Sequence, residues 1–219
     1  HGSDHGGSLR TPAAFCGVVG LRPSPGRISS GNFDNLYMIE GAQGPMARST
    51  RDCALFLDAM SGFDRRYPLS IPAPETSFQN AVLQADGKLR IAYSADLNGF
   101  SPIDAEVREH LDGVLGLLQR EGAIVEQTCP DLTGLDKTYR SLRGLMWAAM
   151  GQGVKPEIRA HFKGTLEENF ASGEALGVAD IAAAHRNRSA LYTRMVALFE
   201  QFDVLACPSV GCLPHDQSE

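Results

Sequence analysis

LRIAYSADLNGFSPIDAEVREHLDGVLGLLQREGAIVEQ, residues 89–127, is the stretch that decides the fold class. Apolar and polar residues alternate at its start, which predicts a half-buried strand over 89–94, and a second strand is expected over 123–127. Between them a helix is expected to begin at Asp104 and to end at Gly122. Its apolar stripe consists of Val107, Leu111, Val114, Leu115 and Leu118. Two strands joined by a helical crossover predict a parallel sheet covered by helices, so the fold class is α/β.

Glycine and proline punctuate the residues from 1 to 62, which predicts loops and short strands there. Two helices are expected within this segment. Thr11 is predicted to cap the first, with Pro12 in its first turn and Gly17 at its end. Ser49 is predicted to cap the second, whose buried face would be Cys53, Phe56, Leu57 and Met60.

The remainder of the chain continues the α/β pattern. Residues 63–88 are polar and rich in proline, which predicts a surface connection. Residues 138–202 have mostly helical periodicity, and a buried strand is expected over 204–207. The most regular helical face is Leu191, Met195, Leu198, Phe199 and Phe202. We therefore expect a single domain in which 1–62 forms a core, 63–88 connects, and 89–219 holds the strand–helix–strand unit and the helical part.

Composition excludes several classes of protein. The chain has 219 residues, of which 43% are hydrophobic, and this is typical of a soluble globular domain. A formal net charge of -6 argues against nucleic acid or anionic lipid as a partner. No apolar run approaches the roughly 20 residues needed to span a bilayer. Five cysteines without a C-x-x-C pair fit neither a disulfide framework nor a zinc site. We expect a cytoplasmic protein.

The histidines do not suggest a metal site. His110, His161 and His185 are scattered over helical faces without the spacing of metal ligands. We therefore expect no metal and no cofactor.

The sequence GSDHGGSLR, residues 2–10, places Ser8 directly after two glycines. Glycine permits a sharp turn that can aim several N–H groups at one point, and such a nest of donors binds an anion. In an amide hydrolase the anion would be the tetrahedral oxyanion, and a neighbouring serine would be the nucleophile. Glycine loops ending in serine also cap helices and close turns, so this short pattern leaves both interpretations open.

Two longer stretches extend the pattern. Residues 2–29, GSDHGGSLRTPAAFCGVVGLRPSPGRIS, match D-x-G-G-S-[IL]-R-x-P-A-x-x-C-G-[VI]-x-G-L-[KR]-P, and residues 44–62, GPMARSTRDCALFLDAMSG, match G-P-[ML]-[AT]-R and a following helix. Both resemble the amidase-signature family, and residues 89–97 and 202–208 are similar to its weaker landmarks. The resemblance covers nearly the whole chain and is most specific in 1–62. It implies a mixed sheet covered by helices, incomplete in this chain.

The resemblance implies hydrolysis of a carboxylic amide through an acyl-enzyme, with a Ser, a second Ser in a cis peptide and a Lys as the catalytic residues. On this basis Ser8 is the nucleophile, and the backbone N–H groups of His5, Gly6, Gly7 and Ser8 form the oxyanion hole. The partner implied is a small-molecule amide, and a homodimer stays open. The cis-Ser and the Lys belong to family segments upstream of this one. The first lysine here is Lys88. We therefore expect an internal fragment that is inactive without the upstream segment of the same protein.

Neighbouring residues have structural interpretations. Asp4 and His5 adjoin on a tight loop and cannot line up with Ser8 as a triad. Arg10 is expected to anchor the loop by hydrogen bonds to carbonyl groups or a carboxylate. Cys16 and Cys53 lie among apolar neighbours and are expected to be small core residues.

Two other functions stay open. One is the A subunit of a glutamyl-tRNA amidotransferase, which shares the signature. Residues 31–44, GNFDNLYMIEGAQG, lack the S-[ST]-x-D-Q-[IVP] run associated with that subunit, which favours a free-standing amidase. The other is a non-catalytic binding domain that inherited the signature.

Overall fold

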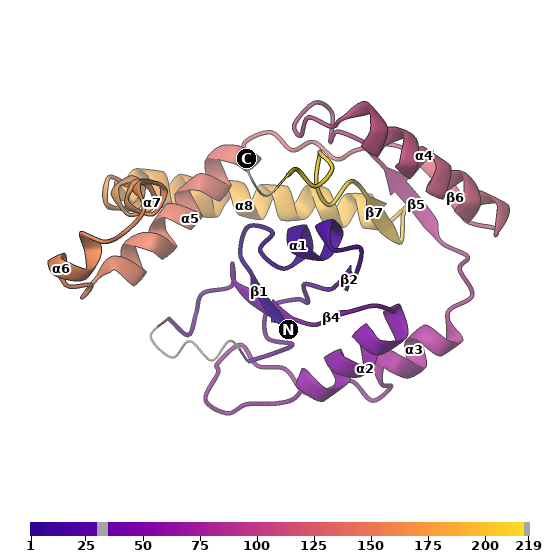
Figure 1. The fold of residues 1–219 in the computed structure, drawn as a ribbon, viewed down its shortest axis with the longest axis horizontal. Coiled ribbons are helices and arrows are strands. Elements are labelled where there is room, and N and C mark those ends of the chain that lie inside the picture. Colours follow the sequence, from indigo (N-terminus) through magenta and orange to yellow (C-terminus); the bar gives the residue numbers. More distant parts are fainter. Residues whose placement is uncertain (30–34, 217–219) are drawn as a thin grey trace. The chain divides into compact units, whose positions relative to one another are not determined.

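The computed structural model describes residues 1–29 and 35–216, and these form two compact units (Figure 1). The first unit comprises His1–Cys129 with Phe202–Glu219, and the second comprises Pro130–Gln201. The first unit contains β1 (Gly2–Asp4), α1 (Arg10–Phe15), β2 (Val19–Gly20), β3 (Ala42–Gly44), β4 (Met46–Ala47), α2 (Thr50–Met60), α3 (Phe78–Gln84), β5 (Arg90–Tyr93), α4 (Ala105–Arg120), β6 (Ile124–Gln127) and β7 (Val204–Ala206). The second contains α5 (Leu135–Gly151), α6 (Pro156–Arg159), α7 (Gly164–Glu174) and α8 (Val178–Phe199).

A parallel sheet of order β6-β5-β7 organises one part of the first unit. Ile91 in the central strand pairs with Val125 of β6 and with Val204 of β7. The core between this sheet and α4 is made of Ile91, Tyr93, Ala95, Leu115 and Ala123. The predicted strand–helix–strand unit and the α/β fold class are therefore confirmed. The strand expected near 204 is also present, although Val204 itself is 37% exposed.

The apolar stripe predicted for α4 is narrower than expected. Leu115 is buried, whereas Val114 and Leu118 are 40% and 38% exposed. The reason is that α4 covers a sheet of only three strands within the described residues, so one row of side chains is enough to fill the contact. No helix of the described residues is long and apolar enough to cross a membrane.

The glycine-rich part of the chain folds into two short antiparallel pairs, β1 with β3 and β2 with β4. Helix α1 packs closely against β2, because a Cβ at Gly20 would lie 2.5 Å from the Cβ of Ala13. Leu9, just before α1, is completely buried. Loops and short strands were predicted here, and the structure adds that one of them, β2, packs against α1.

The second predicted helix, α2, begins as expected, with the Ser49 hydroxyl accepting a hydrogen bond from Asp52 N at 3.1 Å. Cys53 and Leu57 are buried as predicted, but Phe56 is 36% exposed and is not part of the core. The expected surface connection over 63–88 contains a helix, α3, which sequence reasoning missed. Its first amides, Phe78 N and Gln79 N, donate to the Asp58 carboxylate at 2.8 and 3.0 Å. The Ser77 hydroxyl also caps α3 by accepting from Asn80 N at 3.1 Å, so a local cap and a carboxylate twenty residues away act together.

The second unit is entirely helical over its described elements, as the periodicity over 138–202 predicted. Helix α5 packs against α7 at a close backbone approach, since a Cβ at Gly173 would collide with the carbonyl group of Gly144. Helix α8 is joined to α5 by a hydrogen bond from Asn187 Nδ2 to Thr138 Oγ1 at 2.7 Å. Of the face predicted for α8, Leu191 and Leu198 are buried, but Phe199 is 45% exposed.

Candidate active site

Asp4 organises the glycine-rich loop from the end of β1. Its side chain is fully buried, and its carboxylate oxygens accept hydrogen bonds from the Arg10 side chain, Nε and Nη2, each at 2.9 Å. The backbone N–H groups of Gly7 and Arg10 donate to the same carboxylate at 3.0 and 3.2 Å, and that of Leu9 at 3.4 Å. The prediction that Arg10 anchors the loop to a carboxylate is confirmed.

The same contacts correct the predicted start of α1. The helix begins at Arg10 instead of following a Thr11 cap, and no side chain of its neighbouring N-cap residue, Leu9, caps it. The N–H groups at its start, which have no acceptor within the helix, donate instead to the Asp4 carboxylate. Gly17 ends the helix in the left-handed conformation, with φ +62°, as predicted.

The electrostatics of Asp4 favour its ionised form. Burial by itself would raise the pKa of this carboxyl group. The hydrogen bonds from the Arg10 side chain and from the Gly7 and Arg10 amides outweigh burial and hold the pKa of Asp4 well below its usual range. Arg22 adds a second positive charge, with its Nε 3.6 Å from Asp4 Oδ1. The ionised Asp4 carboxylate, hydrogen-bonded to several groups of the loop, therefore fixes the shape of the loop.

Arg22 is a residue of the site that sequence reasoning missed. Besides approaching the Asp4 carboxylate, it donates from Nη2 to the carbonyl oxygen of Glu40 at 2.6 Å and from Nε to that of Asp4 at 3.4 Å. It thereby links the loop to the segment that leads into β3. The available signal was its place at the [KR] position of the motif in residues 2–29.

Ser8 is exposed, whereas its neighbours Gly7 and Leu9 on either side are buried. It lies in the turn that directly precedes α1, as expected. The residues before and after Ser8 are thus packed into the protein, while Ser8 itself faces solvent. This arrangement leaves the Ser8 hydroxyl accessible on a rigid support.

The hydrogen bonds that the Asp4 carboxylate accepts bear on two predictions. One is the set of oxyanion-hole amides, and the other is that Asp4, His5 and Ser8 do not form a triad. The Gly7 N–H, one of the four amides assigned to the oxyanion hole, donates to Asp4 Oδ1. Both carboxylate oxygens are engaged by Arg10 and by loop amides, so Asp4 has a structural role and does not act as the acid of a His5 triad.

Alanine at Gly7 is expected to lower the free energy of unfolding by about 2 kcal/mol or more. Gly7 has φ +110°, and a Cβ there would lie 2.8 Å from Thr11 Oγ1. Gly17 is a matched control, because its φ is +62° but open space surrounds it, so Gly17→Ala should cost only about 1 kcal/mol of backbone strain. Chemical denaturation measures both variants. Equal losses would show that crowding against Thr11 has no energetic consequence.

The loop lies near the carboxyl edge of the parallel sheet. Burial raises the pKa of the Cys207 thiol, directly after β7, with Cys129 adding to the rise and Arg10 opposing it. Arg10 is therefore close enough to act on a group at that edge. The ring of Phe15 in α1 also meets that of His215 edge-to-face, with centroids 6.1 Å apart. In open α/β sheets this is the edge at which ligands bind.

The cysteines in this region were only half correctly predicted. Cys53 is buried, as expected, but Cys16, at the C-cap of the short α1, is exposed.

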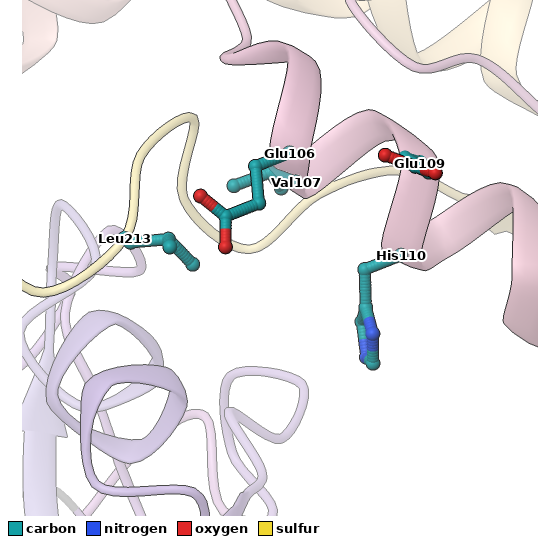
Figure 2. A pocket seen from close by; sticks show the side chains of 5 residues that line it. All are labelled: Glu106, Val107, Glu109, His110 and Leu213. Atoms are coloured by element: carbon teal, nitrogen blue, oxygen red, sulfur yellow. The ribbon is translucent and has the colours of Figure 1, made fainter.

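A separate hollow of about 490 Å³ lies between α4 and the segment after β7 (Figure 2). Glu106 extends toward Leu213, while His110 lies one turn further along the helix. In the described part of the chain, no group of three His, Cys, Asp or Glu side chains converges as metal ligands would. The described side chains of the hollow therefore provide no set of metal ligands.

Comparisons with known proteins agree with this geometry. The model of the family described as Amidase matches residues 1–219. A putative amidase of Synechocystis sp. is 31% identical over 208 residues, which are 94% of this chain and 39% of that protein. The A subunit of the glutamyl-tRNA(Gln) amidotransferase of Lachnospira eligens is 36% identical over 126 residues, 58% of this chain and 26% of that protein.

Among solved structures, a bacterial aryl acylamidase of the amidase-signature enzymes superposes with a TM-score of 0.84 and 26% identity. It is matched over 98% of this chain and 46% of its own length. The chain thus spans less than half the length of the relatives it matches. Because the family model extends over every residue of the sequence, and the loop around Ser8 has the motif and the rigid geometry described above, the chain belongs to the amidase family.

Proposed function

We propose that the complete protein hydrolyses carboxylic amides to an acid and ammonia or an amine, through an acyl-enzyme on Ser8. The observation that carries the proposal is the exposed Ser8. It lies on a loop that the hydrogen bonds of the buried, ionised Asp4 keep in one conformation. Preorganised loops of this kind favour catalysis because they need no rearrangement as charge develops. Both compact units are proposed to belong to a single domain of the family.

The oxyanion is proposed to form against the backbone N–H groups of the loop, at His5, Gly6, Gly7 and Ser8. Because the Gly7 N–H already donates to Asp4, the groups of His5, Gly6 and Ser8 are proposed to make the main contribution. Each such donor is typically worth about 10²–10³-fold in kcat.

The general base is proposed to be a lysine that acts through a serine in a cis peptide, as the family resemblance implies. A buried lysine is suited to this role because desolvation lowers its pKa. Both residues are proposed to lie outside residues 1–219, in the part of the domain that this chain, at less than half of the relatives' length, does not span. The substrate is proposed to be a small-molecule amide. Whether the protein forms a homodimer is left open.

A cytoplasmic location is proposed from the cysteines. All five are free and no disulfide links them within the described residues, which is typical of a reducing compartment.

A glutamine-dependent amidotransferase component is the second candidate, and the matched protein from Lachnospira eligens favours it. That match covers 58% of this chain, whereas the putative amidase match covers 94%. Residues 31–44 also lack the run associated with the amidotransferase, although 31–34 lie outside the described residues. Both observations favour the free-standing amidase.

The pH profile of the complete enzyme is expected to distinguish a lysine base from a histidine base. A lysine must be neutral to accept a proton, so kcat/KM should climb from acidic through neutral pH and level off only above the pKa of that lysine. A histidine base would titrate near its ordinary pKa of about 6.5.

Measuring kcat/KM for a simple amide in the wild type and in His5→Ala makes the comparison. The position of the rising limb should be the same in both proteins, because the substitution keeps the backbone N–H at residue 5. A limb near pH 6.5 that disappears in folded His5→Ala would overturn the lysine mechanism.

A further inference from the structure

A small hollow at the carboxyl ends of β5 and β6 is lined almost entirely by polar side chains. Its volume is about 270 Å³, and its walls are formed by residues that follow the two strands and by Arg108 of α4. In parallel α/β sheets, ligands bind outside this edge. The volume is at the lower end of ligand pockets, which typically begin at about 300 Å³, so any ligand would be small.

The Ser94 hydroxyl is the first sign that the hollow holds a ligand. Ser94 is only 8% exposed and lines the hollow, while its backbone N–H donates to the carbonyl oxygen of Ala206 at 3.1 Å. Among residues 1–29 and 35–216, no hydrogen bond is made by its side chain. Because this hydroxyl lines the hollow and has no protein partner among these residues, it can hydrogen-bond a molecule that occupies the hollow.

Arg108 and Asp96 supply two opposite charges that form an ion pair without a hydrogen bond between them. Arg108 Nη2 lies 3.6 Å from Asp96 Oδ2, which is beyond hydrogen-bond distance. By contrast, Arg90 and Asp203 in the same unit form a forked pair, with Nη2 and Oδ1 2.7 Å apart. Within the described part of the chain, the Arg108 guanidinium group makes no hydrogen bond at all. Its planar set of donors is therefore available to a carboxylate.

The backbone holds Asp96 in place on the wall of the hollow. Three consecutive residues, Leu97, Asn98 and Gly99, have φ of 53°, 58° and 80°, which turns the chain sharply after β5. A hydrogen bond from Ser101 N to the carbonyl oxygen of Asp96 at 2.9 Å closes this turn. Left-handed backbone at a leucine is unfavourable, and it persists where the surrounding structure imposes it.

We propose that this hollow binds a small free α-amino acid. The carboxylate of the ligand would accept hydrogen bonds from the Arg108 guanidinium group, and its ammonium group would donate to Asp96 and to the Ser94 hydroxyl. The residues that line the hollow include one carboxylate, Asp96, and one guanidinium group, Arg108, so its wall carries one negative and one positive charge. Two opposite charges side by side favour a ligand that carries both a carboxylate and an ammonium group over a simple anion or a simple cation.

The proposal can be tested by titration calorimetry of the protein with L-alanine and L-serine. Propionate, which carries only the carboxylate half of an amino acid, and ethylamine, which carries only the ammonium half, are the controls. Saturable binding of an amino acid is expected with a dissociation constant of about 1 mM or below, and each half should bind at least about tenfold more weakly. Arg108→Gln and Asp96→Asn should each weaken amino-acid binding by about tenfold or more, and Ser94→Ala by a smaller factor. Arg120→Gln, on the same helix but outside the hollow, should bind as the wild type does.

Further variants keep the result interpretable. Arg108→Lys retains the charge but loses the fork, so it should also bind more weakly if the carboxylate is held by two parallel hydrogen bonds. Ser8→Ala should bind the amino acid unchanged, which separates this site from the proposed acyl-enzyme chemistry. Absence of saturable binding for both amino acids, or equal binding by folded Arg108→Gln and wild type, would overturn the proposal.

Discussion

Ser8→Ala in the complete enzyme is expected to lower kcat/KM for amide hydrolysis by about 10⁴–10⁶-fold. The substitution removes the proposed attacking oxygen and leaves the backbone N–H of residue 8 in place. Because the loop is fixed through Asp4 and not through the Ser8 side chain, the fold should be retained. Residual catalysis of about 10³–10⁴-fold over water would come from the oxyanion hole and substrate binding.

The matched control is Ser3→Ala. Ser3 is also exposed, and it lies opposite Gln43 in the β1–β3 pair. It should retain near wild-type activity. A phosphonylating probe followed by mass spectrometry provides an independent measurement, because only Ser8 should be labelled. Labelling or turnover that survives in Ser8→Ala would remove this residue from the mechanism.

Asp4→Asn is expected to lower the free energy of unfolding by about 3 kcal/mol. The buried carboxylate accepts hydrogen bonds from the Arg10 side chain and from the amides of Gly7 and Arg10. An asparagine would turn one acceptor into a donor that faces these donors, and it would leave the two neighbouring arginines without their charge partner. Activity should also fall, since the loop would lose its shape.

Asp64→Asn is a suitable control. Arg66 Nε lies 2.9 Å from Asp64 Oδ1, as close as Arg10 Nε lies to Asp4 Oδ2, but the Arg66 side chain is 68% exposed and that of Asp64 18%. Exposed pairs contribute about 1 kcal/mol or less, so the loss should be small. Urea denaturation of both variants measures the difference. A loss in Asp4→Asn no larger than in Asp64→Asn would contradict the role of Asp4 as the buried hub of the loop.

The Asp4 contribution is also expected to depend on pH. The pKa of Asp4 is lower in the folded protein than its unfolded value of about 3.9. The stabilisation is therefore fully present above that unfolded value and is lost as pH falls through the folded one. The stability difference between wild type and Asp4→Asn should be constant above about pH 5 and should shrink below about pH 4.

Several features of the fold were predictable because they depend on neighbours in sequence. The strand–helix–strand unit over 89–127, the Ser49 cap of α2 and the turn at Gly17 each follow from residue types a few positions apart. The position of Ser8 before α1 follows in the same way. Sequence also indicated that Arg10 would bind a carboxylate, but not which one.

The sequence by itself determined the fold class, the family motif and the serine of the loop, since strand alternation, helix periodicity and glycine turns are local properties. Tertiary structure alone decided the rest. Asp58 binds the first amides of α3 from twenty residues away, in addition to the local Ser77 cap, and β5 pairs with β7 more than a hundred residues later. The placement of Arg108 Nη2 3.6 Å from Asp96 Oδ2 likewise requires α4 to lie across the end of β5. Such contacts are set by packing between segments that are distant in sequence, beyond the neighbouring residues from which strand alternation and helix periodicity are read.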